Sequence, residues 1–96
     1  MIGILATITV KDGTGPDFEA VFLELTAKVR ANEPGNVLYQ LTRSRTEANT
    51  YIVMELYTDQ ESVDQHGKSD HFREIGRKMG PFMAGPPAID RVDAVV

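Results

Sequence analysis

The stretch IGILATITVKDGTGPDFEAVFLELTAKV, residues 2–29, decides the fold because its hydrophobic periodicity changes once along its length. From Ile2 to Val10 apolar residues recur at every second position, which is typical of a β-strand with one strongly apolar face. Two glycines and a proline at 11–16 end that strand. The apolar positions that follow have the spacing of an amphipathic helix, and they are Phe18, Val21, Phe22, Leu25 and Val29. The stretch therefore predicts a strand followed by a helix.

Two more strands are predicted after this helix. Glu33-Pro34-Gly35-Asn36 has proline and glycine at the positions that are typical of a type II turn. Residues 37–43 and 51–57 then alternate between apolar and polar side chains, with a polar connection between them. We expect these two segments to form an antiparallel hairpin.

The C-terminal part predicts two short helices and a last strand. Thr58 and Glu61 have the spacing of a capping box, which starts the first helix. Residues 67–69 interrupt this helix, and the second one ends at Gly80-Pro81. Strand-like alternation returns at 88–96. The order is then strand, helix, strand, strand, helix, helix, strand.

This order predicts one α+β domain over residues 1–96, of the ferredoxin-like, split βαβ kind. Its four-stranded antiparallel sheet would carry the helices on one face. The strands are apolar on both faces, with Leu5 opposite Ile4 and Val53 opposite Ile52. A second apolar sheet face needs a cover, and a domain of this size gains stability by burying more surface. We therefore expect a homodimer that forms through the sheet faces.

Composition excludes several classes of function. Ten Lys and Arg against 14 Asp and Glu give a net charge of −4, and the basic residues are scattered, which disfavours nucleic acid as a partner. Cysteine is absent, so disulfides and thiolate catalysis are excluded and a reducing cytoplasm is expected. No apolar run is long enough to span a membrane. Gly13-Thr14-Gly15 lacks the lysine of a phosphate loop, and we expect no cofactor.

Three polar residues are candidates for catalysis. His66 can take or give a proton near neutral pH, although it could equally cap the break after it. His71 lies five positions later and shares a face with His66 only if the helix is broken; without an obvious third ligand, we expect no metal site. Glu55 lies between aromatic residues of a strand, either as an acid or base or as the partner of Arg43 or Arg91.

Aromatic and methionine side chains could form the walls of a substrate pocket, although the spacing of several of them is also that of core residues. The candidates are Tyr39, Tyr51, Tyr57, Phe72, Met79 and Phe82.

The segment YIVMELYTD at 51–59, followed by His66, Ser69 and His71, resembles the signature of the antibiotic biosynthesis monooxygenase domain family. Glu33-Pro34-Gly35 also fits the family pattern. The resemblance covers nearly the full chain and implies a dimeric α+β barrel. It implies several activities, among them cofactor-independent oxygenation of anthrones and quinols, haem degradation, and isomerisation of a phosphorylated hydroxyketone. Gly76 stands where the haem-degrading branch has its iron ligand, which disfavours that activity.

The resemblance thus implies a monooxygenase that oxidises a small aromatic, hydroquinone or anthrone-type substrate with O₂, with His66 as the general base. Two alternatives use the same residues. One is an isomerase of a small phosphorylated hydroxyketone, which Tyr57 favours because that branch has Glu-x-Tyr at this place. The other is a dimer that binds a ligand without converting it.

Overall fold

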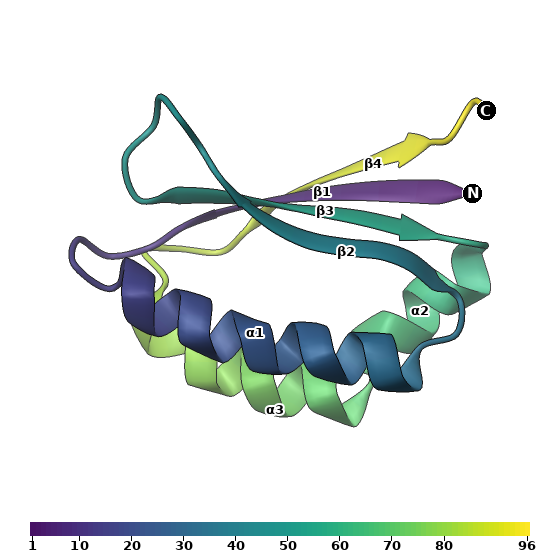
Figure 1. Ribbon diagram of the computed structural model, residues 1–96, viewed down its shortest axis with the longest axis horizontal. Coiled ribbons are helices and arrows are strands. Elements are labelled where there is room, and N and C mark those ends of the chain that lie inside the picture. Colours follow the sequence, from purple (N-terminus) through teal and green to yellow (C-terminus); the bar gives the residue numbers. More distant parts are fainter.

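The computed structural model describes all 96 residues and contains four strands and three α-helices in the predicted order. The strands are β1 (Ile2–Thr9), β2 (Asn36–Arg43), β3 (Thr50–Tyr57) and β4 (Ala88–Asp93). The helices are α1 (Gly15–Asn32), α2 (Gln60–Lys68) and α3 (Asp70–Met79), with a short 3₁₀ turn at Gly80–Phe82. Figure 1 shows two layers, with all three helices on one face of the sheet. The predicted α+β architecture is confirmed.

The sheet has the strand order β2-β3-β1-β4, and every neighbouring pair is antiparallel. β1 is central and pairs Ile4 with Glu55 of β3 on one side and with Arg91 of β4 on the other. These three side chains therefore point to the same face of the sheet. That face is the one that carries the helices, because Ile4 and Glu55 are buried beneath them.

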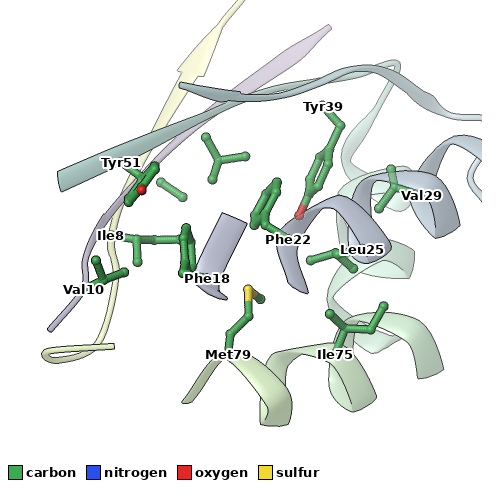
Figure 2. Close-up of a cluster of buried hydrophobic side chains, with 12 residues drawn as sticks. Ile8, Val10, Phe18, Phe22, Leu25, Val29, Tyr39, Tyr51, Ile75 and Met79 are labelled. Atoms are coloured by element: carbon green, nitrogen blue, oxygen red, sulfur yellow. The ribbon is translucent and has the colours of Figure 1, made fainter. Parts of the chain in front are cut away.

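The core lies between α1, α3 and the sheet (Figure 2). Phe18, Phe22, Leu25 and Val29 of α1 are almost completely buried, as their helical spacing predicts. Pro16 occupies the first turn of this helix, where its missing N–H costs nothing. Ile75 and Met79 of α3 pack on the same cluster. One apolar interface thus joins the helical layer to the sheet.

Two local expectations are wrong. Helix α2 is capped by Asp59, whose side chain accepts a hydrogen bond from the Ser62 backbone N–H, and not by Thr58. The turn after α1 has the expected hydrogen bond from the Asn36 N–H to the Glu33 carbonyl, but Gly35 does not have the positive φ of a type II turn. Glycine is needed there for space, because a Cβ atom on Gly35 would lie 2.0 Å from the Ser62 hydroxyl.

The opposite face of the sheet has no cover in the single chain. Leu5, Leu38, Met54 and Val92 are exposed on it, with between 37% and 49% of each residue accessible. This face is apolar, as the two-sided pattern of the strands predicts.

None of the helices combines the length and the apolar character that crossing a bilayer requires.

Candidate active site

A cavity of about 490 Å³ lies between the sheet and the helices. Its floor is formed by the sheet, where Ile4 and Ala6 of β1, Val53 of β3 and Tyr39 of β2 line it, and its other walls come from α1, α2, α3 and β4. Most of the lining is apolar, while His66 and Glu55 are polar and buried. A volume of this size suits a small organic ligand, and the apolar walls suit an aromatic one.

His66 lies in the last turn of α2 and is only 6% exposed. Three aromatic rings surround its imidazole, with ring centroids 5.3 Å away for Tyr39, 5.6 Å for Tyr57 and 4.8 Å for Phe72. Helix α2 ends at Lys68, two residues after His66, and Ser69 separates it from α3. Of the residues proposed from the sequence, His66 is thus placed in the cavity wall.

Glu33 forms hydrogen bonds with Nδ1 of His66. Its two carboxylate oxygens lie 2.9 Å and 3.0 Å from Nδ1, and both side chains are more than nine-tenths buried. An ionised carboxylate can only accept hydrogen bonds, so Nδ1 carries the proton and donates it to Glu33. Neutral His66 then has an unprotonated Nε2, which is free to accept a proton.

The turn at the end of α1 places Glu33 in this position. The backbone N–H of Glu33 still bonds to the Val29 carbonyl, so the residue caps the helix. Pro34 and Gly35 then turn the chain, and Gly35 lets the turn lie directly against Ser62 of α2. The glutamate side chain is thereby directed at the far end of α2, where His66 lies.

Glu55, on strand β3, faces Nε2 of His66. Its Oε1 accepts a hydrogen bond of 2.7 Å from the Tyr57 hydroxyl and lies 4.0 Å from Nε2 of His66. Burial raises the pKa of Glu55 above that of an ordinary carboxyl, while the Tyr57 hydrogen bond and His66 partly oppose that shift. Neither of the proposed arginine partners is used, since Arg43 lies near Glu19 and Arg91 makes no ion pair with Glu55.

His71 contacts the same glutamate from α3. Its Nε2 lies 2.5 Å from Oε2 of Glu33, and its side chain is 14% exposed. The two helices are separated by Ser69, which is extended and caps α3 by accepting a hydrogen bond from the Phe72 N–H at its hydroxyl oxygen. The interruption is shorter than the predicted residues 67–69, because Gly67 and Lys68 still belong to α2, and it brings both imidazoles to one carboxylate. His71 itself does not line the cavity.

Glu33, His66 and His71 also form the kind of group that can hold a metal ion, with ligand atoms that all lie within 4.8 Å of one another. In a tetrahedral site with bonds of about 2.0–2.1 Å, the ligand atoms are about 3.3 Å apart. Here Glu33 is 2.9 Å from one imidazole nitrogen and 2.5 Å from the other, which are hydrogen-bond distances. The three residues could hold a cation only if Glu33 moved away from both imidazoles.

The proposed pocket residues divide into two groups. Tyr39, Phe72 and Met79 line the cavity. The prediction is wrong for the other three residues, which do not line it: Tyr51, Tyr57 and Phe82. Tyr51 binds Glu19 near the other end of the sheet, and Tyr57 is fully buried beside Glu55. Phe82 packs against the core. Alternating strand residues share a face, but only part of a face borders any one cavity.

Glu33 is the residue that the sequence reasoning missed as part of the site. Its signal was present in the Glu-Pro-Gly turn, which was noted only as part of a family pattern. Arg91 also lines the cavity, although the sequence suggested it only as a partner of Glu55. Nothing in its spacing relates it to His66, because the pairing of β4 with β1 brings it there.

The chain is thus a small α+β protein in which a four-stranded sheet covers a buried histidine–carboxylate pair beside an apolar cavity. The family model of the antibiotic biosynthesis monooxygenases matches residues 1–78, and the chain belongs to this family.

Known proteins of similar sequence and structure agree with this assignment. The chain is 28% identical to the "Putative monooxygenase YcnE" of Bacillus subtilis (strain 168) over 93 residues, which is 97% of each chain. It is 50% identical to a "putative antibiotic biosynthesis monooxygenase" of Caulobacter crescentus CB15, whose crystal structure matches 99% of this chain and 90% of that one with a TM-score of 0.96. A similarly described protein of Nitrosomonas europaea shares 18% identity and the fold, with full coverage of both chains and a TM-score of 0.90.

Proposed function

We propose that the chain is a monooxygenase that oxidises a small electron-rich aromatic compound, such as a hydroquinone or an anthrone, with O₂ and without a cofactor. The observation that carries the proposal is the Glu33–His66 pair, because it places the proton of a neutral imidazole on Nδ1 and points Nε2, the other nitrogen, at the wall of an apolar cavity. Family membership supports the reaction class.

In the first step, His66 Nε2 takes a proton from the substrate and leaves an electron-rich anion. Glu33 stabilises the imidazolium that forms, because its carboxylate already binds Nδ1. The apolar walls keep water away from the anion, which makes it a stronger reductant. The buried position of His66, at 6% exposure, is consistent with a proton that stays in the site.

In the second step, the anion gives one electron to O₂, and the two radicals combine to form a carbon–oxygen bond. The resulting peroxide takes back the proton held on His66 and becomes a hydroperoxide. Its O–O bond then breaks as the second hydrogen leaves the same carbon, so one oxygen atom departs as water and the other remains in the product as a carbonyl group. All four electrons that reduce O₂ come from the substrate, so an anthrone and O₂ give a quinone and water without an external reductant.

The second candidate is an isomerase of a small hydroxyketone, and the distance between His66 and Glu55 favours it. Nε2 of His66 and Oε1 of Glu55 lie 4.0 Å apart, so both can reach protons on neighbouring atoms of one ligand. Such a pair suits proton transfer across an enediol, which needs no O₂. Turnover of a hydroxyketone under nitrogen would favour this candidate, whereas strict dependence on O₂ favours the oxygenase.

We also propose that the protein is a homodimer whose two sheets pack face to face. The outer sheet face exposes Leu5, Leu38, Met54 and Val92, and no element of the same chain covers it. Contiguous apolar surface of this kind marks an interaction site in soluble proteins.

The test of the oxygenase is oxygen consumption by the metal-stripped protein with anthrone or 1,4-naphthohydroquinone, beside His66→Gln. Uptake above the spontaneous rate that is lost in the variant supports the proposal. Uptake at the spontaneous rate alone contradicts it.

A further inference from the structure

Tyr39 differs from the other two tyrosines in how its hydroxyl is bonded. Tyr51 donates to Glu19 and Tyr57 donates to Glu55. Tyr39 is only 4% exposed, yet its hydroxyl makes no hydrogen bond within the chain. The hydroxyl therefore stabilises no contact of the fold, and phenylalanine would fill the same place.

The Tyr39 hydroxyl faces the cavity. Every fully enclosed side-chain oxygen or nitrogen in the structure has a hydrogen-bond partner, so the unbonded hydroxyl must face open space. The cavity is the space that Tyr39 lines. Figure 2 shows its ring extending from β2 toward the helices, with the oxygen at the far end. The ring is held by stacking on Phe22, with a centroid distance of 5.5 Å and an interplanar angle of 7°.

Its surroundings keep this hydroxyl protonated. Burial raises the pKa of Tyr39, and the nearby carboxylates of Glu55 and Glu33 raise it further. A tyrosine that stays neutral is a hydrogen-bond donor at every working pH. The Tyr39 ring lies 5.3 Å from the His66 ring, so one small ligand can reach both side chains.

We propose that the Tyr39 hydroxyl binds the oxygen of a ring carbonyl or phenolate and thereby selects oxygenated aromatic ligands over hydrocarbons of the same shape. Quinones, anthrones and phenolates belong to this class. The substrate class rests on the proposed oxygenase, but binding itself requires no turnover.

The test compares 1-indanone with indane, two flat fused-ring probes that differ in one carbonyl group. Their dissociation constants are measured by NMR titration for the unmodified protein and for Tyr39→Phe. Loss of a buried hydrogen bond is expected to weaken 1-indanone binding about tenfold and to leave indane binding within about twofold. Tyr51→Phe, which lies outside the cavity, should leave both constants unchanged.

Folding is checked in the same variants. Tyr39→Phe should unfold at the same temperature as the unmodified protein or higher, since its hydroxyl has no partner in the chain, whereas Tyr51→Phe loses its bond to Glu19. Equal binding of 1-indanone by Tyr39→Phe, an equal loss for both probes, or no saturable binding of 1-indanone by the unmodified protein would each overturn the proposal. Oxygen uptake is measured separately, so the oxygenase can fail while this inference stands.

Discussion

Oε2 of Glu33 lies 2.9 Å from Nδ1 of His66, although 33 positions separate the two residues in the chain. The carboxylate fixes which nitrogen of the imidazole carries the proton. Glu33 is thus a positioning residue, and His66 is the residue that touches the substrate in the proposed reaction.

Glu33→Gln is expected to lower kcat by about 10²-fold and to change KM by less than about threefold. The amide can donate its N–H₂ to Nδ1, which would place the imidazole proton on Nε2 and remove the base. Steady-state kinetics with anthrone measure both constants. Glu47→Gln, on an exposed loop, is the matched control and should leave both unchanged. A Glu33→Gln variant with the original kcat would show that the carboxylate does not position His66.

Glu55 makes the stability depend on pH. Because burial raises the pKa of Glu55 in the folded protein, the native state holds this proton at pH values where the unfolded chain has lost it. The free energy of unfolding therefore falls as pH rises from the ordinary carboxyl pKa through the raised one. The cost is about 1.4 kcal/mol for each unit of the shift. Glu55→Gln should remove this loss.

Urea unfolding at pH 4 and pH 8 measures this effect in the unmodified protein and in Glu55→Gln. From pH 4 to pH 8, the free energy of unfolding should fall in the unmodified protein by more than it does in Glu55→Gln. An equal change in both proteins would mean that Glu55 titrates normally in the folded state.

Gly35→Ala is expected to destabilise the protein by about 1–3 kcal/mol, because the new Cβ would lie 2.0 Å from the Ser62 hydroxyl. Ser62→Gly in the same chain should remove most of that cost. Gly76→Ala is the control, since nothing lies within 4 Å of its Cβ and helix α3 should gain about 0.5–1 kcal/mol. Chemical denaturation measures all of these variants. If Gly35→Ala is harmless, the turn does not lie against α2 as described.

Met54→Asp tests the dimer. Met54 is 40% exposed on the open sheet face, and a charge there would be buried between two packed sheets. We expect the molar mass from sedimentation equilibrium to change from two chains to one at micromolar concentration. Leu23→Asp places the same charge on an apolar residue that is 66% exposed on α1, on the helical side of the domain, and should remain dimeric. A monomeric unmodified protein, or a variant that stays dimeric, would contradict packing through the sheet faces.

The fold was predictable because it depends on periodicity. The alternation in residues 2–10 and the helical stripe from Phe18 to Val29 each specify one element, and the element order leaves few topologies for so short a chain. The two local errors concern details that depend on neighbouring elements. Glycine is required at position 35 because Ser62 lies so close to it, and Ser62 is 27 residues further along the chain, beyond the reach of local turn statistics.

The candidate site was predictable only in part. His66 and Glu55 carry chemistry that draws attention in a sequence, and the break that lets His71 approach was visible as residues 67–69. Glu33 was missed as their partner because it follows a helix and precedes a turn, where glutamates are common at the surface. The packing of α1 against α3 brings its carboxylate to His71, and the contact of the Gly35 turn with α2 brings it to His66.

Oxygen consumption with anthrone tests the central claim most directly. The unmodified protein, stripped of metal with a chelator, and His66→Gln are compared at equal concentration, with the spontaneous rate subtracted and melting temperatures checked. The account predicts one O₂ consumed for each quinone formed, and at least about a 10²-fold lower rate in His66→Gln. The same rate in the folded variant, or no uptake by the unmodified protein above the spontaneous rate, would contradict it.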